Sequence, residues 1–121
     1  MSSNASQILL VEDDPDQAQL FTLILSADGY AVSTTPEAET ALARLATSPV
    51  ALVLADWNLP GMKGDALIAA VKAQYPGVPA VLYSNHIHVD QAAAACGADG
   101  WFRKIDDMAR LRKLIADLLA T

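Results

Sequence analysis

Three short apolar segments stand out along the chain. They are ILLV at 8–11, VALVLA at 50–55 and PAVLYS at 79–84, and none shows the apolar–polar alternation of a strand with one exposed face. Runs of this length, rich in Val and Leu, are typical of strands covered on both faces, as in a parallel sheet. YAVST at 30–34 and GWFRK at 100–104 are weaker candidates, which we place nearer the sheet edges. The pattern therefore predicts five strands.

Helical patterns fill the segments between the predicted strands. Asp14 before Pro15 fits a helix N-cap followed by the first helical residue, and Gly29 is placed to end that helix. Thr35 and Pro36 repeat the same start for a second helix. In three of the helices, apolar residues at helical spacing predict the face turned toward the core. These residues are Ala38, Ala41, Leu42 and Leu45 in the second helix, Leu67, Ile68 and Val71 in the third, and Met108, Leu111, Ile115 and Leu118 in the fifth. The fourth helix is expected at about 88–96, in an Ala-rich stretch.

The order of these elements is strand then helix, five times over. Such alternation with short connections predicts an α/β fold with a parallel sheet, right-handed crossovers and helices on both faces. A closed barrel needs eight such units, so we expect an open, doubly wound sheet of five strands. At 121 residues the chain is predicted to be a single domain spanning 1–121, with no output domain.

The composition of the chain restricts the compartment and the kinds of binding partner expected for this domain. The chain is 53% hydrophobic and 18% charged, which is typical of a folded globular protein. Its single cysteine, Cys96, excludes an internal disulfide and suits a reducing compartment. A net charge of -6 disfavours binding to nucleic acid or anionic lipid. No segment approaches the roughly 20 apolar residues of a membrane span, so we expect a cytoplasmic protein with no membrane contact.

Four acids follow the first predicted strand within five positions. They are Glu12, Asp13, Asp14 and Asp16 in the stretch LLVEDDPD at 9–16. Two carboxylates about 4 Å apart oppose each other by roughly 4 kcal/mol at an effective dielectric of about 20. Asp14 is explained as a helix cap, but the other acids at this strand end need a compensating charge. A divalent cation is the first candidate.

Polar residues also end three other predicted strands. Asp56 follows the third, Ser84 ends the fourth and Lys104 ends the fifth. Because the carboxyl ends of parallel strands meet at one edge, we expect these residues to face one crevice, with Asp56 the most buried acid. Clustered carboxylates suit Mg²⁺, whose open positions receive phosphoryl oxygens, and Lys104 and Ser84 can contact the same oxygens. Asp56 is then the nucleophile that forms an aspartyl phosphate.

Four segments in this order resemble the receiver domain of two-component response regulators, and the resemblance covers nearly the whole chain. They are ILLVEDDP, DWNLPGMKG, VLYSNH and GADGWFRK. The resemblance implies a flavodoxin-like sheet in the order 2-1-3-4-5. It also implies that Asp56 accepts phosphate from the phosphohistidine of a sensor histidine kinase or a phosphotransfer protein. Asp13 would bind Mg²⁺ directly and Glu12 through water, with Asp56 and the backbone carbonyl of Asn58 completing the metal ligands.

The resemblance further implies a switch. Ser84 would move toward the phosphoryl group, Lys104 would pair with its oxygens, and Trp101 would occupy the position of the rotating aromatic residue. The switch would change binding to a downstream effector or output domain, or a homodimer formed through the helix at 88–96, the strand at 100–104 and the last helix. Two residues depart from the family pattern: Trp101 is larger than the usual Tyr or Phe, and Ile105 replaces the usual proline. We predict a trans peptide before Ile105, because a cis bond there costs roughly 2.5–4 kcal/mol.

Several features of the sequence bear on alternative functions. A phosphatase with Asp56 as its nucleophile would require a general acid two residues later in the chain. That position is Asn58, which has no acidic proton. A flavodoxin-type redox carrier would want Gly, Ser or Thr after the first strand, where this chain is acidic. A receiver-like interaction domain that has lost phosphorylation remains open. Asn58 and His86 could flank the path of an attacking water or lie in a solvated loop, while His86 and His88 alone are too few ligands for a transition metal.

Overall fold

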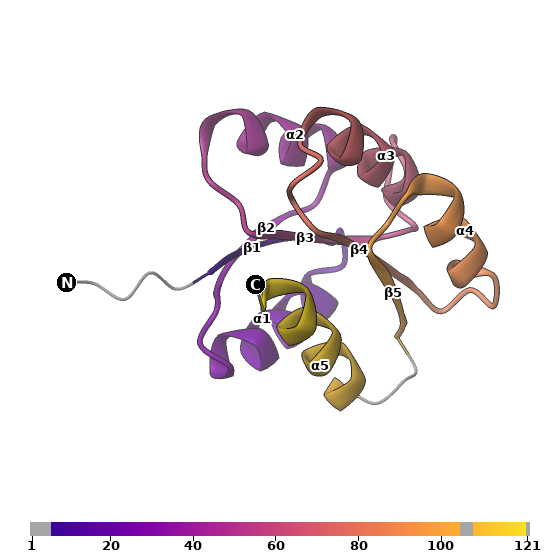
Figure 1. The fold of residues 1–121 in the computed structure, drawn as a ribbon. Coiled ribbons are helices and arrows are strands. Elements are labelled where there is room, and N and C mark those ends of the chain that lie inside the picture. Colours follow the sequence, from indigo (N-terminus) through magenta and orange to yellow (C-terminus); the bar gives the residue numbers. More distant parts are fainter. Residues whose placement is uncertain (1–5, 105–107, 121) are drawn as a thin grey trace.

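The computed structural model describes residues 6–104 and 108–120, in which five strands alternate with five helices (Figure 1). The elements are β1 (Gln7–Val11), α1 (Pro15–Ala27), β2 (Ala31–Thr35), α2 (Ala38–Thr47), β3 (Leu52–Asp56), α3 (Gly64–Gln74), β4 (Ala80–Ser84), α4 (Val89–Cys96), β5 (Gly100–Arg103) and α5 (Met108–Leu119). Every strand and helix predicted from the hydrophobic pattern is present, with boundaries shifted by a few residues at most.

The five strands form one parallel sheet in the order β2-β1-β3-β4-β5. The predicted open, doubly wound α/β architecture and its strand order are confirmed, and the two weaker strand candidates are the two edges. Figure 1 shows α2, α3 and α4 on one face of the sheet and α1 and α5 on the other. The carboxyl ends of β1 and β3 therefore lie side by side, with the end of β4 next along the edge.

Alternate residues of each central strand enter two separate apolar layers. From β1, Leu9 and Val11 pack with the α2–α3–α4 side, while Ile8 and Leu10 pack with the α1–α5 side. All five residues of β3 and of β4 are buried. A strand covered on both faces gains nothing from polar alternation, which is why the sequence of these strands reads as continuous apolar runs.

The first helix starts and ends as the sequence predicts. Asp14 has an extended backbone, and its side chain accepts a hydrogen bond from the backbone N of Asp16 at 3.0 Å. Pro15 is the first helical residue, where its missing N–H leaves no helix bond unmade. Beyond the helix, Gly29 has a φ of 95°, a conformation that glycine adopts without steric cost.

The predicted start of the second helix is wrong. Thr35 is the last residue of β2, and its carbonyl accepts a hydrogen bond from the backbone N of Glu12 at 3.0 Å. The helix begins at Ala38, after an extended Glu37 in the N-cap position. Pairing with β1 thus holds Thr35 in the sheet and displaces the helix start, because a residue cannot serve both elements.

The two helices of the α1–α5 face are also joined by charge. Arg112 of α5 donates two hydrogen bonds of 2.8 Å to the carboxylate of Asp28 at the end of α1. The arginine lowers the pKa of Asp28 and the carboxylate raises that of Arg112.

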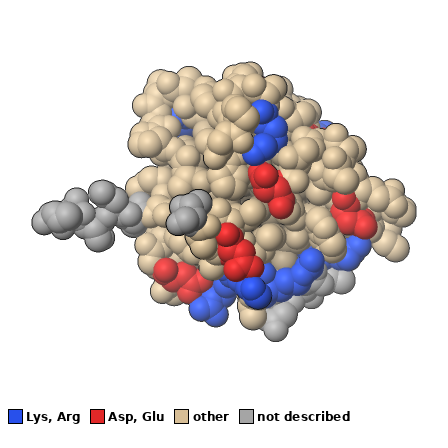
Figure 2. Space-filling model, viewed as in Figure 1, with Lys and Arg blue, Asp and Glu red and all other residues tan. Residues whose placement is uncertain are grey.

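In Figure 2, acidic and basic side chains lie next to one another on the visible face rather than in separate patches. No helix within 6–104 and 108–120 is long and apolar enough to cross a membrane.

Candidate functional site

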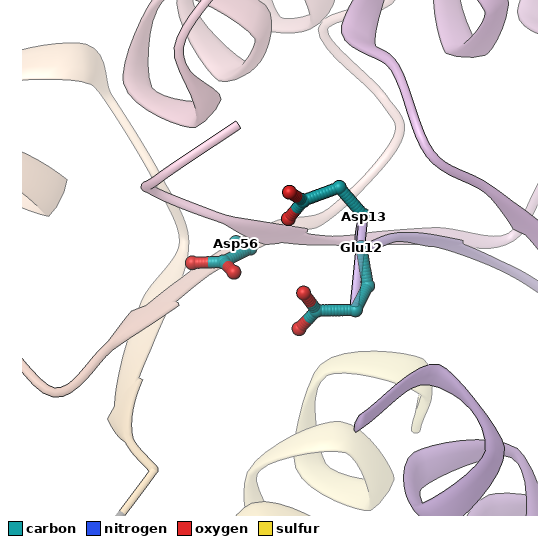
Figure 3. Close-up of side chains that lie close together, drawn as sticks. All are labelled: Glu12, Asp13 and Asp56. Carbon is teal, nitrogen blue, oxygen red and sulfur yellow. The ribbon is translucent and has the colours of Figure 1, made fainter. Parts of the chain in front are cut away.

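Three acids meet at the carboxyl edge of the sheet. Glu12 and Asp13 directly follow β1, and Asp56 is the last residue of the neighbouring β3. One ligand oxygen from each carboxylate lies within 4.8 Å of the others (Figure 3). Within the described residues this is the one group of three or more potential metal ligands at such separations. The sequence predicted both its members and its place at this edge.

Burial differs among the three acids. Glu12 and Asp56 are each 3% exposed, whereas Asp13 is exposed to solvent. The prediction that Asp56 would be the most buried is therefore wrong, because Glu12 is equally buried. The physical reason is that the longer Glu12 side chain turns back into the protein and meets the hydroxyl of Tyr83.

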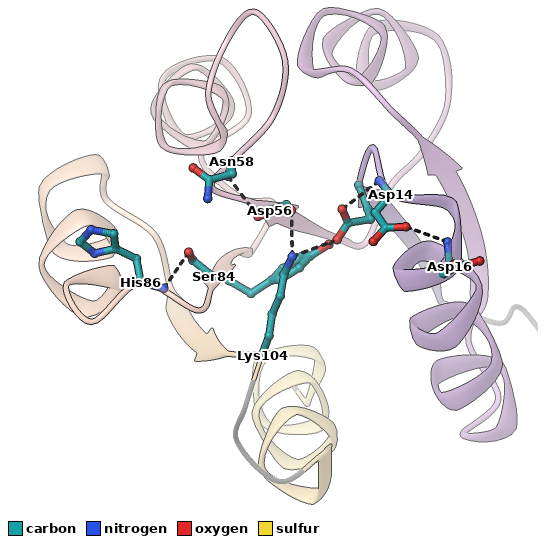
Figure 4. A network of polar contacts seen from close by, with 9 residues as sticks. Asp14, Asp16, Asp56, Asn58, Ser84, His86 and Lys104 are labelled. Atoms are coloured by element: carbon teal, nitrogen blue, oxygen red, sulfur yellow. Dashed lines mark hydrogen bonds and ion pairs between the residues drawn. The ribbon is translucent and has the colours of Figure 1, made fainter.

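Lys104, just beyond β5, places its ammonium between the two buried acids. Its Nζ lies 3.0 Å from Asp56 Oδ2 and 3.5 Å from Glu12 Oε1 (Figure 4). Its side chain is 16% exposed, so this positive charge is only partly screened by water. The lysine therefore offsets part of the repulsion between the carboxylates when no cation is bound. The peptide bond to Ile105, predicted to be trans, lies outside the described residues.

Glu12 has a hydrogen bond on each of its carboxylate oxygens. Oε1 accepts from the Tyr83 hydroxyl at 2.6 Å, and Oε2 accepts from the backbone N of Asp14 at 3.1 Å. Burial raises the pKa of Glu12, and the nearby charge of Asp56 adds to this; the two hydrogen bonds and Lys104 act in the opposite direction. Burial, followed by the charge of Glu12, raises the pKa of Tyr83 well above its usual value, so this hydroxyl stays protonated.

Sequence reasoning missed Tyr83 as a member of this site. It was counted only as one of the apolar residues of its strand, and its ring is fully buried. A signal was nevertheless available, because a tyrosine at the last position but one of a buried central strand needs a partner for its hydroxyl. The acids at the end of β1 are the partners within reach.

The loop after Asp56 holds the aspartate in place. The backbone N of Asn58 donates to Asp56 Oδ1 at 3.0 Å, and the backbone N of Gly64 donates to the carbonyl of Trp57 at 3.0 Å. Gly61 has a φ of 71°, a left-handed conformation that glycine adopts without steric cost. These contacts tie the start of α3 directly to the end of β3.

Ser84 is buried at the end of β4, and its Oγ accepts a hydrogen bond from the backbone N of His86 at 3.0 Å. The His86 ring packs edge-on against Trp57, with centroids 5.1 Å apart, and its Nδ1 accepts from the backbone N of His88. Figure 4 shows His86 on the α4 side of the site, beyond Ser84. Among the described residues, neither histidine belongs to a group of three potential metal ligands.

Trp101, on edge strand β5, is half-buried, and two guanidinium groups lie near its ring. The Arg103 and Arg110 carbons are 5.0 Å and 4.5 Å from its ring centroid. The ring lines a surface hollow between α4 and α5, with Asp90 and Leu114 among its other lining residues. Two stacked cations stabilise this ring position, each by about 0.5–1 kcal/mol at an exposed site.

The family of this chain follows from a match to a protein-family model. The model described as the response regulator receiver domain matches residues 8–116, which is most of the chain. This chain is a response regulator receiver domain. The resemblance noted in the sequence is thereby confirmed, and it extends from β1 into α5.

Curated relatives match this chain over part of their own length. The response regulator protein FleR of Pseudomonas aeruginosa is 33% identical over 114 residues, covering 93% of this chain and 24% of FleR. The transcriptional regulatory protein GlrR of Escherichia coli is 32% identical over 121 residues, covering 98% of this chain and 27% of GlrR. The chain therefore spans about a quarter of the length of these relatives.

Two solved structures match this chain over nearly the whole of their own length. The chemotaxis response regulator CheY4 of Vibrio cholerae has a TM-score of 0.87 at 27% identity, covering 96% of this receiver domain and 100% of that chain. The response regulator TrrA of Thermotoga maritima, solved in complex with Mg²⁺-BeF, has a TM-score of 0.86 at 25% identity, covering 94% and 99%.

Proposed function

We propose that this receiver domain accepts a phosphoryl group on Asp56 from a sensor histidine kinase or a phosphotransfer protein, with Mg²⁺ as cofactor. The observation that carries the proposal is the setting of Asp56. One of its oxygens accepts a hydrogen bond from the backbone N of Asn58, the other lies 3.0 Å from Lys104 Nζ, and two more acids each offer an oxygen within 4.8 Å, close enough to share a cation. The family match supports the same function.

The donor set fits Mg²⁺. Mg²⁺ prefers oxygen ligands, uses one or two carboxylates and keeps several waters, which suits a cluster with one exposed and two buried acids. Asp13 and Asp56 would bind the ion directly, Glu12 through water, and the backbone carbonyl of Asn58 would be a further ligand. When bound, the ion neutralises phosphoryl oxygens. The Mg²⁺-BeF complex of TrrA supports this choice of metal.

The reaction at Asp56 is a phosphoryl transfer. A carboxylate oxygen of Asp56 forms the new bond to phosphorus, and the donor's bond to phosphorus breaks with its electron pair leaving on the donor. Lys104 then exchanges its contact with the free carboxylate for contact with a phosphoryl oxygen. The domain catalyses only its own phosphorylation and dephosphorylation, so we do not class it as an enzyme acting on a separate substrate.

Phosphorylation would be read out by a change of shape. Ser84 Oγ would leave the backbone N of His86 and donate to the phosphoryl group, which biases the surface formed by α4, β5 and α5 between two arrangements. Trp101 lies on that surface and would report or resist the change. The partner would be a downstream effector, an output domain or a second copy of this chain, in the cytoplasm and without direct contact to nucleic acid or membrane.

The second candidate is an interaction domain that has lost phosphorylation. No specific observation favours it, since Lys104 Nζ lies 3.0 Å from Asp56 Oδ2 and the three acids each offer an oxygen within 4.8 Å of the others.

Metal-dependent phosphorylation tests the proposed function directly. Purified protein incubated with acetyl phosphate and Mg²⁺ should gain the mass of one phosphoryl group per chain, measured by intact-mass spectrometry. EDTA should prevent the gain, because the repulsion of the clustered acids toward the incoming phosphoryl oxygens is then uncompensated. A gain that is unaffected by EDTA would contradict the role of the metal, and no gain in Mg²⁺ would favour the interaction-domain alternative.

Mg²⁺ binding should weaken on acidification, and it should do so at a higher pH than at a site with an ordinary glutamate. The pKa of Glu12 is raised above 4.5 by burial, so protons compete with the cation at a higher pH than at an ordinary glutamate. We expect Mg²⁺ affinity to be full above the raised pKa and to fall as the pH drops through it. Calorimetric titrations at successively lower pH below 7 measure this, with Glu12→Gln as the control that should lose this part of the pH dependence. An unchanged profile in Glu12→Gln would assign the dependence to another group.

A further inference from the structure

Tyr83 and Glu12 form a buried hydrogen bond that links β4 to β1 across β3. The donor and acceptor oxygens are 2.6 Å apart, and the residues are 71 positions apart in the chain. Tyr83 is 0% exposed and Glu12 is 3% exposed, so water does not compete for the bond. In the sheet, Tyr83 pairs directly with Asp56 of β3. The contact therefore spans the strand that carries the proposed phosphoacceptor.

The tyrosine ring is fixed independently of Glu12. It packs edge-on against Phe21 of α1, with centroids 5.0 Å apart and ring planes at 72°. Lys104 also lies over the ring, with Nζ 5.2 Å from the ring centroid. A ring held in this way presents its hydroxyl in one direction, so Glu12 adjusts to Tyr83 rather than the reverse.

Lys104 is the other side-chain donor facing Glu12 Oε1. Its Nζ lies 3.5 Å from that oxygen and 3.0 Å from Asp56 Oδ2. If the Tyr83 hydroxyl were missing, Glu12 Oε1 would turn to Lys104 to recover a hydrogen bond, because a buried carboxylate without donors is costly. Lys104 would then be drawn from Asp56, and Glu12 would turn away from its two acidic neighbours.

We propose that Tyr83 is a positioning residue for the magnesium site, holding the Glu12 carboxylate in the acid cluster and leaving Lys104 to Asp56. The proposal rests on the proposed function, since it assigns Tyr83 a part in the same site. It needs no contact between Tyr83 and the metal or the phosphoryl group. Partners of metal ligands commonly matter in this way, and their loss costs roughly 10–100-fold in metal affinity.

The Tyr83→Phe variant removes the hydroxyl and keeps the ring against Phe21. We expect its Mg²⁺ dissociation constant, measured by calorimetry at neutral pH without phosphodonor, to rise about tenfold. The matched control is Tyr75→Phe at the end of α3, since the half-buried Tyr75 makes no side-chain hydrogen bond in the described structure. This control should bind Mg²⁺ as the wild type does. A thermal unfolding scan of each variant establishes that it is folded at the temperature of the titration.

A double-mutant cycle separates positioning from general structural damage. Glu12→Ala should weaken Mg²⁺ binding, and adding Tyr83→Phe to it should weaken binding no further, because Tyr83 acts through Glu12. An equal loss from Tyr83→Phe with and without Glu12 would overturn the proposal, as would wild-type affinity in Tyr83→Phe alone. Those outcomes leave the proposed function intact if the wild type binds Mg²⁺. A wild type that binds no Mg²⁺ would overturn both.

Discussion

Replacing Asp56 by asparagine is expected to abolish phosphorylation, reducing the phosphorylated fraction after incubation with acetyl phosphate and Mg²⁺ from most of the protein to none detectable. The amide has nearly the same shape as the carboxylate, and its oxygen can still accept the hydrogen bond from the backbone N of Asn58. It lacks the anionic oxygen that attacks phosphorus, so the fold should survive while the chemistry is lost. Intact-mass spectrometry measures the loss.

The control for Asp56→Asn is the same substitution at Asp65. Asp65 lies in the first turn of α3, and its Oδ1 accepts a hydrogen bond from the neighbouring backbone N of Ala66. It is not part of the acid cluster, so Asp65→Asn should be phosphorylated like the wild type. Retained phosphorylation of Asp56→Asn would move the acceptor to another residue, with Asp13 the first to examine.

The substitution Gly64→Ala is expected to cause the largest loss of stability of any single methyl group added near the site. An alanine Cβ at this position would lie 2.0 Å from the carbonyl oxygen of Asp56 and 2.9 Å from the Cα of Trp57. Both neighbours are backbone atoms of the strand end, so they cannot swing aside as a flexible side chain would. We expect the free energy of unfolding to fall by about 3 kcal/mol, at the upper end of typical overpacking costs.

Gly77→Ala is the matched control for Gly64→Ala. A Cβ at Gly77 meets no atom within 4 Å, and its backbone does not need the left-handed conformation. Urea unfolding of the two variants should therefore show a large shift of midpoint for Gly64→Ala and little change for Gly77→Ala. If Gly64→Ala were as stable as the wild type, the tight contact between the start of α3 and the end of β3 would not exist in solution.

The fold followed from the sequence because the strongest patterns agree with the tertiary structure. The apolar runs at 50–55 and 79–84 contain most of β3 and β4, two of the three interior strands, and every residue of these two strands is buried. Asp14 and Pro15 predicted the start of α1 correctly because the Asp14 side chain accepts a hydrogen bond from a backbone N only two residues along the chain, with no distant partner involved. Local signals of this kind are readable in one dimension.

The misses all involve contacts between distant segments. Thr35 looks like a helix cap locally, yet it completes β2 because β1 pairs with it. Glu12 is as buried as Asp56 because Tyr83, far along the chain, offers it a hydrogen bond. Neither partner is visible from the local sequence, so the place of Thr35 in the sheet and the burial of Glu12 had to come from the structure.

The sequence predicted the three acids and the lysine of the candidate site, but not Tyr83. The sequence indicated that Glu12, Asp13, Asp56 and Lys104 share one edge, because residues at the ends of parallel strands collect there. It did not indicate which carboxylate oxygen faces which donor. Those details depend on rotamers that the packed core selects, and they distinguish the roles of Lys104 and Tyr83.

The central claim is that Asp56 itself carries the phosphoryl group, and borohydride trapping tests it most directly. An aspartyl phosphate is an acyl phosphate, which borohydride reduces to an alcohol and so converts the aspartate to homoserine. We expect peptide mass mapping of wild-type protein, trapped after incubation with acetyl phosphate and Mg²⁺, to find homoserine at position 56 and aspartate at position 13. Homoserine at another acid, or at none, would contradict the account.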